Sequence, residues 1–357
     1  MLMGSFAYEA LPMRVRFGSG TVSALREEVA HLGLHRVLIL CTPGQATLGE
    51  LISAALGEHS AGLLAEARTH VPIEVATHAR DRATALGADG CVVVGGGSAI
   101  GLGKIVALEH GLPIVAVPTT YAGSEMTSVW GLTSDGVKQT GKDLRVLPAS
   151  VLYDPELTVA LPVPISVTSG LNAVAHAVEA LYAPDASPII SLLAEEGTRA
   201  MTTALPAIVR DPGDLDARTL ALYGSWLCGV CLGATTMSLH HKLCHTLGGT
   251  LNLPHAATHA VVIPHVLAYN QAAAPAATEA LSRALGASDP ARALWDLAGK
   301  LRAPRSLAEL GMRKDDIEPI AEQVVANPYA NPAPITRDGV VRLLRAAWSG
   351  QPPSTIS

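Results

Sequence analysis

Short apolar runs alternate with stretches of helical spacing between residues 36 and 157. Four of the runs carry Val, Ile and Leu at consecutive positions, which is typical of parallel strands covered on both faces. The stretches between them show helical periodicity and end at or beside glycine, a frequent helix stop. This alternation predicts βαβ units and a parallel sheet. The runs lie at 36–43, 90–98, 112–120 and 150–157, and the clearest helical stretches at 71–88 and 98–111.

The second half of the chain has a different pattern, in which long Ala- and Leu-rich segments are separated by Pro and Gly. The change falls in the Pro-rich stretch 154–164, and prolines mark connections between elements. We therefore predict an α/β domain over residues 1–157 and an all-helical domain over 158–357. The predicted helical segments are 167–183, 188–209, 215–248 and 256–284.

Composition narrows the classes of partner. Of the 357 residues, 49% are hydrophobic and 16% are charged, which is typical of an ordered globular protein. A net charge of -6 gives no basic field for phosphate backbones, so we expect a small-molecule substrate and no nucleic-acid partner. The sequence has no apolar run of bilayer length, and its first residues lack the pattern of a signal peptide. It thus favours a cytoplasmic protein without a membrane partner.

The five cysteines are odd in number, widely spaced and surrounded by apolar residues, which favours reduced core thiols over a disulfide framework. A redox pair at Cys228 and Cys231 is the alternative, but their surroundings are typical of a buried helix rather than an exposed helix start.

Residues 91–104 combine a buried strand, three glycines and a helix. Gly95, Gly96 and Gly97 let the backbone approach a pyrophosphate, and the free N–H groups of a helix start favour an anion. Ser98 adds a hydroxyl group. The run lacks the GxGxxG spacing of the usual dinucleotide fingerprint. A tight turn without a ligand is therefore the alternative for this loop taken alone.

The next predicted strand ends in a loop rich in hydroxyl groups, with Thr119, Thr120 and Ser124. The carboxyl ends of neighbouring parallel strands share one edge of a sheet, where α/β proteins bind nucleotides. Two such loops together favour a dinucleotide site over a bare turn.

Histidines gather in the helical half, where seven of the 13 lie between residues 176 and 265. Positions i and i+4 of a helix share a face, so three predicted helices each offer groups that can point into one cavity. Satisfied core or surface histidines are the alternative for this set. The groups are Asn172 with His176, His241 with His245, and His255 after the helix-starting Pro254.

These motifs together resemble the iron-containing (group III) alcohol dehydrogenases. In that family an Asp-x3-His helix, a His-x3-His helix and a Pro-His turn enclose a divalent metal, and GGGS and PTT loops hold NAD. The resemblance extends from "RFGSGTVSAL" through "YDPEL" to the helical half. It implies the dehydroquinate synthase-like fold, an NADH cofactor and a homodimer that pairs an amino-terminal strand, here "MRVRFGSG". Thr42 replaces an acidic residue that often holds the adenosine ribose, so NADPH stays open.

Two positions depart from the metal-dependent pattern. Asn172 offers a neutral amide oxygen where the family has an Asp carboxylate, a weaker ligand for a divalent ion. Gly101 replaces the Asp of GGGSxxD. Both departures, with "LHHKLCHTLGG" and "NPYANPAPIT", are similar to the maleylacetate reductases, a branch of this superfamily that works without a metal. The resemblance implies NAD(P)H-dependent reduction of the C=C bond of maleylacetate to 3-oxoadipate, in aromatic-compound degradation, with no bound metal.

The chemistry of that reduction suits these side chains. Hydride delivered to the alkene makes an enolate, whose oxygen needs hydrogen-bond donors, and an Asn amide avoids the negative charge that would repel a dianionic substrate. His245 is the candidate proton donor, because imidazole titrates near neutral pH. The candidates for enolate stabilisation are Asn172, His176, His241 and His255. The candidates for substrate binding are Tyr121, Lys242 and Lys138, which aligns with a family lysine near the nicotinamide.

Two other functions stay open at this point. One is a metal-dependent alcohol dehydrogenase that tolerates Asn172 and holds Zn or Fe with three histidines. The other is a non-catalytic nucleotide-binding protein that keeps the fold alone, since a fold does not guarantee activity.

Overall fold

The computed structural model describes residues 6–134 and 137–354. Two compact units divide the chain. One, here called the α/β unit, is Ala10–Leu161, and the other, the helical unit, comprises the described residues from Pro162 onward together with residues 6–9. The sequence places the division a few residues earlier, between 157 and 158, and assigns the first residues to the α/β domain.

The α/β unit contains a six-stranded parallel sheet with the order β1-β8-β5-β4-β2-β3. The four predicted runs form the four central strands, so the prediction of a parallel sheet is confirmed. Two edge strands complete it. The strands are β1 (Arg14–Phe17), β2 (Val37–Cys41), β3 (Ser60–Leu64), β4 (Gly90–Gly95), β5 (Ile114–Pro118) and β8 (Ser150–Tyr153).

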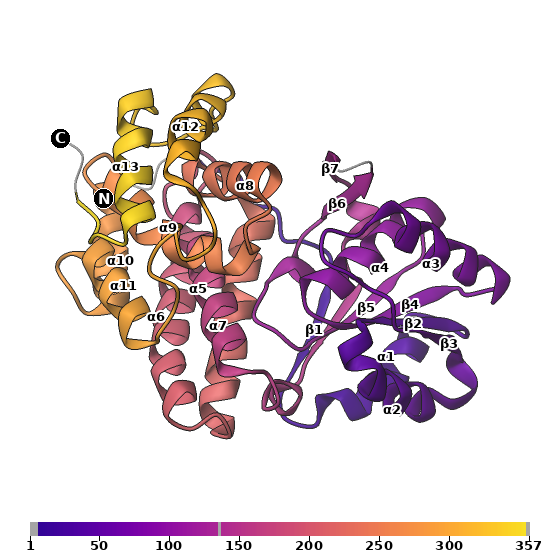
Figure 1. The fold of residues 1–357 in the computed structure, drawn as a ribbon. Helices are drawn as coiled ribbons and strands as arrows, with labels where there is room; N and C mark the ends of the chain where they lie inside the picture. Colours follow the sequence, from indigo (N-terminus) through magenta and orange to yellow (C-terminus); the bar gives the residue numbers. More distant parts are fainter. Residues whose placement is uncertain (1–5, 135–136, 355–357) are drawn as a thin grey trace. The chain divides into compact units, whose positions relative to one another are not determined.

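Helices cover both faces of this sheet (Figure 1). On one face, Leu25 and Val29 of α1 pack in the same apolar core as Val92 and Val94 of β4. On the other face α4 approaches so closely that a Cβ on Gly103 would lie 2.4 Å from Val93 Cγ2. Only glycine permits this contact, and it fixes the start of α4 beside the end of β4. The helices are α1 (Leu25–His31), α2 (Ala46–Leu56), α3 (Ile73–Ala85) and α4 (Gly97–His110).

A two-stranded antiparallel hairpin, β6 (Val129–Ser134) and β7 (Val137–Lys142), stands apart from the main sheet. The sequence does not predict this hairpin, because its residues are largely polar and lack the apolar runs that identify the other strands. The backbone of Lys138 pairs with Thr133 in this hairpin. The side chain of Lys138 lies outside the described part of the structure, so its predicted role stays a prediction.

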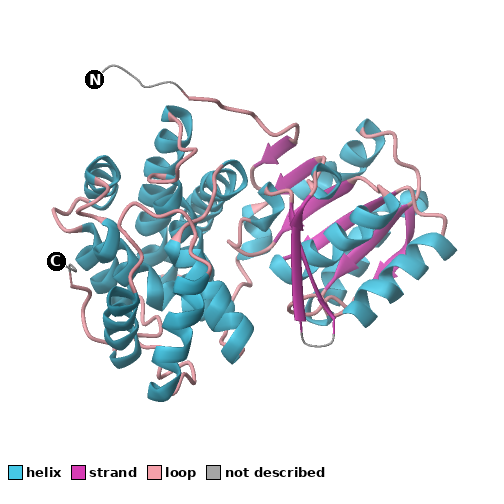
Figure 2. Ribbon diagram, turned by 90° about the horizontal axis from the view of Figure 1, so that it is seen from above, coloured by secondary structure: helices cyan, strands magenta, loops and turns pink. Residues whose placement is uncertain are grey.

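All of the described strands belong to the α/β unit, and the rest of the chain is helical, as predicted (Figure 2). One apolar cluster of the helical unit is formed mainly by Leu, Val and Ile from α8, α9, α12 and α13, and α5, α6 and α7 bury further apolar residues. The helices are α5 (Val163–Ala180), α6 (Pro188–Arg210), α7 (Leu215–Ala234), α8 (Leu239–Leu251), α9 (His255–Asn270), α10 (Pro275–Leu285), α11 (Pro290–Lys300), α12 (Ile317–Ala326) and α13 (Arg337–Ser349).

The predicted helical segment 215–248 is helical but divided. The structure has two helices, α7 and α8, bent by 93° at a short break. The bend has a tertiary cause, because the backbone N–H groups of Ser238 and His240 at the start of α8 donate to the Glu179 carboxylate of α5. The segment 256–284 is likewise divided, into α9 and α10.

Among the described residues, no single helix combines the length and apolar character needed to cross a bilayer; α7 and α8 meet that test only as a bent pair.

Candidate functional site

The glycine loop joins β4 to α4 in a conformation that requires glycine. Gly95 has a φ of 140°, a region that other residues rarely adopt. A Cβ on Gly96 would lie 2.6 Å from Thr120 Oγ1, so the loop after β5 packs directly on the loop after β4. The helix α4 begins at Gly97 without a side-chain cap on its first N–H groups. These features suit an anion at the helix start.

Three parallel strands bring their carboxyl ends to this point. Val94 of β4 pairs with Cys41 of β2, and Gly95 pairs with Pro118 of β5. Thr42, directly after β2, and Thr119, directly after β5, therefore flank the glycine loop. From here the strand order continues from β2 to β3 on one side and from β4 to β5 and β8 on the other. Such a reversal of strand order leaves a crevice in doubly wound sheets.

The hydroxyl groups at these strand ends differ in their partners. Thr119 is buried, and its Oγ1 accepts a hydrogen bond of 2.9 Å from Gln45 Nε2. Ser124 Oγ is buried and has no hydrogen-bond partner among the described residues. It lies 4.0 Å from the position of a Cβ on Gly97, and so faces the glycine loop. Gln45 was missed by the sequence analysis, because nothing in its local sequence indicates a contact with residue 119.

A buried lysine on α4 holds the loop that follows β5. Lys104 Nζ donates to the backbone oxygens of Ser124 and Thr127 at 2.7 Å each, and to that of Val129 at 2.8 Å. Burial lowers the pKa of Lys104 to about 7, and the charge of nearby Glu125 acts in the opposite direction. The loop that carries the predicted cofactor-binding hydroxyls is thereby fastened to α4.

The unusual Gly101 has a packing explanation. A Cβ at this position of α4 would lie 2.8 Å from Val71 Cγ2. Val71 is buried and has a φ of 46°, so it is held in a conformation that is costly for a β-branched residue. An Asp side chain at position 101 would collide with Val71. The glycine that departs from the family pattern leaves room for this neighbour.

In the helical unit, the predicted histidines come together on α5, α8 and α9. Asn172, His176 and His241 are buried, whereas His245 and His255 are exposed. Two further rings, His240 and His259, join them. The ring centroids are separated by 5.2 Å for His176 and His241, 5.9 Å for His241 and His245, 5.0 Å for His241 and His259, 4.7 Å for His240 and His259, and 4.4 Å for His255 and His259. The rings that share helix faces thus lie in one group, here called the histidine cluster.

Glu179 is the member of this site that sequence reasoning missed. Its carboxylate is fully buried and accepts from His241 Nδ1 at 2.6 Å, in addition to the two backbone N–H groups at the start of α8. The bond from Nδ1 places the other ring nitrogen of His241, Nε2, away from Glu179. A signal was present in the sequence, since Glu179 is the one acidic residue in an Ala-rich helix and lies three residues after His176.

The buried imidazoles are held neutral. Burial, reinforced by the charges of neighbouring histidines, keeps the pKa of His176, His240 and His259 well below its ordinary value. Beside these neutral rings, His241 is bonded to the Glu179 carboxylate and His245 is exposed.

Several buried polar atoms around His241 are left for a ligand. Asn172 Oδ1, His176 Nδ1 and His241 Nε2 are buried and have no hydrogen-bond partner within residues 6–134 and 137–354. Buried polar atoms without partners are uncommon and point to a missing binding partner. The two residues from α5 share one helix face, and the His241 ring stacks against that of His176.

The predicted substrate-binding residues are in different settings. Lys242 is partly buried on α8, with Nζ 5.4 Å from the centre of the Tyr329 ring. Tyr121 follows β5 in the α/β unit and is fully buried.

The five cysteines are buried and free, and both Cys228 and Cys231 lie on α7, so the prediction of reduced core thiols is confirmed.

Comparisons with known proteins cover both units. The family model of iron-containing alcohol dehydrogenases matches residues 12–155, and the C-terminal model of the Fe-containing alcohol dehydrogenase family matches residues 166–348. The chain is 54% identical over 352 residues to the maleylacetate reductase of Burkholderia cepacia, covering 99% of this chain and 100% of that protein. It is 53% identical to the maleylacetate reductase of Sphingobium indicum, covering 98% and 99%. The crystal structure of maleylacetate reductase from Agrobacterium tumefaciens is 50% identical and superposes with a TM-score of 0.96, covering 98% of this chain and 100% of that one.

Proposed function

The chain belongs to the iron-containing alcohol dehydrogenase family, and we propose that within it this protein is an oxidoreductase that reduces maleylacetate to 3-oxoadipate with NAD(H). The observation that carries the proposal is the pairing of a neutral Asn172 with a cluster of imidazoles, in a chain whose full-length relatives are maleylacetate reductases. A dicarboxylate substrate favours such a site, because a carboxylate at position 172 would repel it.

The α/β unit binds the dinucleotide. The bare N–H groups at the start of α4 and the Ser98 hydroxyl are available to the pyrophosphate, and glycine at position 96 leaves room beside Thr120. When bound, the reduced nicotinamide supplies a hydride. Thr42 at the end of β2 carries no charge that would reject a 2′-phosphate, so we propose NADH as the cofactor with NADPH also accepted.

The helical unit stabilises the charge that develops on the substrate. Hydride addition to the alkene carbon β to the ketone produces an enolate, and the Asn172 amide can donate to its oxygen through Nδ2. His241 donates through Nε2 only as an imidazolium, because its Nδ1 bonds to Glu179. The Glu179 carboxylate stabilises that imidazolium, so we assign the charge-stabilising role to the pair. His176 and His255 contribute to the same pocket in this proposal.

His245 delivers the proton that completes the reduction. It is exposed, unlike His176 and His241, and so exchanges protons with water between turnovers. Its ring lies 5.9 Å from that of His241, one helical turn away on the same face of α8. Imidazole is suited to this step because it is both acid and base near neutral pH. Lys242, Tyr121 and Lys138 remain the proposed contacts of the substrate carboxylates.

The positions that bind iron in this family do not fit a divalent metal here. Asn172 and three imidazoles supply no anionic ligand atom, and the Glu179 carboxylate, which bonds to His241 Nδ1, offsets only one of the two charges of a buried divalent ion. His255 is exposed while His176 and His241 are buried, and in the described chain these three histidines do not form a set with all ligand atoms within 4.8 Å. We derive no step through a metal and propose that the reduction is metal-independent.

We also propose that the protein acts as a homodimer in the cytoplasm. Its strand β1 pairs in parallel with β8 and forms one edge of the sheet, which leaves the other side of β1 for a second copy. Five buried thiols suit a reducing compartment.

The decisive experiment uses maleylacetate, NADH and a strong chelator. We expect the loss of reduced-nicotinamide absorbance to proceed at an unchanged rate after complete metal removal, and simple aldehydes to be poor substrates. Aldehyde reduction that requires added Zn²⁺ or Fe²⁺ would instead establish a metal-dependent alcohol dehydrogenase, the second candidate favoured by the family as a whole.

A further inference from the structure

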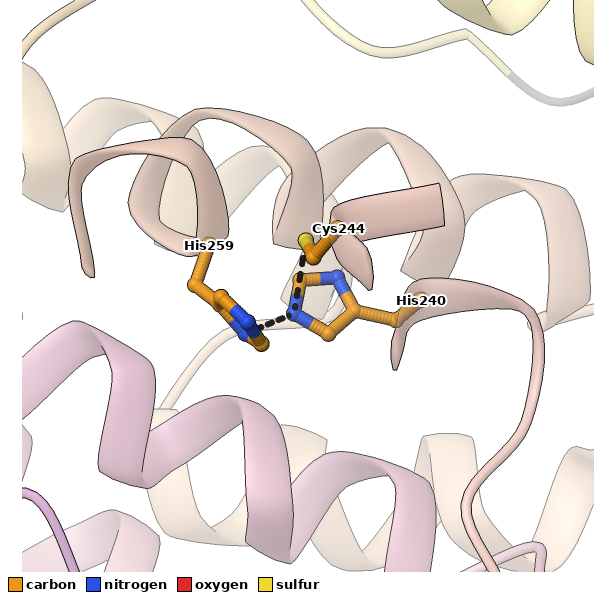
Figure 3. Close-up of side chains that lie close together, drawn as sticks. All are labelled: His240, Cys244 and His259. Carbon is orange, nitrogen blue, oxygen red and sulfur yellow. Dashed lines mark hydrogen bonds between the residues drawn. The ribbon is translucent and has the colours of Figure 1, made fainter. Parts of the chain in front are cut away.

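Three side chains next to the proposed reaction centre form a compact set of metal-binding type. His240 and Cys244 lie one turn apart on α8, and His259 projects from α9 toward them (Figure 3). Their ligand atoms all lie within 4.8 Å of one another, the one such set of His, Cys, Asp or Glu among the described residues. None of the three occupies a position that corresponds to an iron ligand of the family.

The distances suit a small ion bound by one sulfur and two nitrogens. Cys244 Sγ is 3.8 Å from His240 Nε2. Bonds of about 2.3 Å to sulfur and about 2.0 Å to nitrogen place those atoms roughly 3.5 Å apart around a tetrahedral ion, close to the distance observed. His240 Nε2 and His259 Nδ1 are 2.8 Å apart and hydrogen-bonded, so they must separate by less than about 1 Å to share the ion. A small rotation of the His259 ring achieves this.

The protein itself does not use the full hydrogen-bonding capacity of these rings. His240 Nδ1 and His259 Nε2 are buried and have no partner in the described residues. His241, by contrast, has a carboxylate on Nδ1. An ion bound at the inner nitrogens, His240 Nε2 and His259 Nδ1, turns both outer nitrogens into N–H donors, which then bond to water or another acceptor.

We propose that His240, Cys244 and His259 bind a thiophilic metal ion of the Zn²⁺ type, and that the bound ion inhibits the reductase. On binding, the Cys244 thiol loses its proton to solvent and a sulfur–metal bond forms. The hydrogen bond between the two rings breaks, and the ring that had donated it transfers its proton to its outer nitrogen. No electrons change hands. One thiolate and two imidazoles are a ligand set that Zn²⁺ and other thiophilic ions prefer.

Inhibition follows from the position of His241, and this part rests on the proposed function. The His241 ring lies 5.3 Å from that of His240 and 5.0 Å from that of His259. Binding rotates the His259 ring, a direct neighbour of the His241 ring, so His241 moves from the position that the proposed enolate site requires.

Cobalt absorption tests the binding without any turnover. Thiolate ligation of Co²⁺ gives intense near-ultraviolet charge-transfer absorption. We expect metal-free protein to develop this band and saturate at one equivalent of Co²⁺ per chain. Cys244→Ser should lose the band. Its affinity for Co²⁺ should fall by more than roughly 100-fold, because loss of a hydrogen-bond partner of a ligand already costs up to that much. Cys228→Ser, a matched change at a thiol equally buried on α7, should keep it.

Further variants separate this site from the iron-ligand positions of the family. His176→Ala should keep the cobalt band, and Cys244→Ala repeats the test with a smaller apolar side chain, with thermal unfolding of each metal-free variant as the check on folding. A band that is absent in the wild-type protein, or lost in Cys228→Ser and kept in Cys244→Ser, overturns the proposed site.

Activity tests the second half of the proposal. We expect Zn²⁺ to lower kcat of the wild-type protein by roughly tenfold or more, and to leave Cys244→Ser at its own metal-free rate. Full activity of the cobalt-saturated protein would overturn inhibition while leaving binding intact. Absence of any maleylacetate reduction in metal-free protein would instead overturn the proposed function, with no effect on the cobalt result.

Discussion

The two candidate sites are built from different materials. In the α/β unit the glycine loop offers main-chain N–H groups, and its glycines leave room, because a Cβ on Gly96 would collide with Thr120. In the helical unit the histidine cluster offers ring nitrogens and carboxylate oxygens that buried helices bring together. Substitutions that add atoms should therefore impair the first site, and substitutions that remove atoms should impair the second.

The largest effect is expected from removal of His245, the proposed proton donor. His245→Ala should lower kcat for maleylacetate by about 10²–10⁴-fold, the usual contribution of general acid–base catalysis. The Kd for NADH should stay the same, because the proposed dinucleotide site lies in the other unit. Steady-state kinetics and fluorescence titration with NADH measure the two quantities.

A matched control is His31→Ala, which removes an exposed imidazole from α1 of the α/β unit. It should leave kcat unchanged. Retention of more than about a tenth of wild-type kcat in His245→Ala would assign the proton to water or to another histidine.

Glu179→Gln should have an intermediate effect. The glutamine side chain has one oxygen and one NH₂ group where glutamate has two oxygens. At least one of the three N–H groups bonded to Glu179 therefore faces an N–H donor instead of an acceptor. We expect the free energy of unfolding to fall by about 1–3 kcal/mol and kcat to fall roughly 10- to 100-fold, as for other residues that orient a functional histidine. Nitrogen-15 NMR of His241 reports the tautomer directly, which we expect to change from Nδ1–H to Nε2–H.

The control removes a carboxylate from α6 instead. Glu196→Gln breaks a pair with Arg199 that is largely exposed, and should change stability by no more than about 0.5 kcal/mol. If Glu179→Gln is destabilised but keeps both kcat and the His241 tautomer, Glu179 serves only to cap α8.

The smallest effect is expected from adding a methyl group to the glycine loop. Gly96→Ala places a Cβ against Thr120, and the glycine loop must shift to relieve this overpacking. A cost of about 1 kcal/mol for that shift corresponds to a Kd for NADH that is roughly five- to tenfold weaker. Gly249→Ala makes the same change in α8, where nothing lies within 4 Å, and should leave the Kd unaltered. Equal Kd values for both variants would show that the glycine loop does not hold the dinucleotide.

The sequence predicts the elements whose signals are local. Consecutive Val and Ile residues identified β2, β4 and β5, and the i, i+4 spacing placed His241 and His245 on one face of α8. Features that depend on partners distant in sequence were missed. The break between α7 and α8 depends on Glu179, which is 59 residues before Ser238. The hairpin of β6 and β7 has a polar sequence that resembles a loop until its strands pair.

The site residues show the same limit. The spacing of Asn172, His176, His241 and His245 indicated which side chains could meet, and the structure brings them together. It did not indicate which nitrogen of each ring is available, because that depends on hydrogen bonds from other helices. Gln45, Glu179 and His259 acquire their roles through such contacts. The sequence pattern thus predicts which side chains lie close together, whereas the orientation of each ring depends on the folded structure.

The anchoring of one loop by Lys104 has a dynamic consequence. A single ammonium group binds backbone oxygens of Ser124, Thr127 and Val129, so these segments cannot separate from α4 one at a time without losing a partner for a buried cation. Amide hydrogen exchange in this loop should therefore follow the slow, cooperative opening of the sheet rather than the fast fraying of a surface turn. A loop that is ordered in advance has little conformational entropy left to lose when a nucleotide arrives.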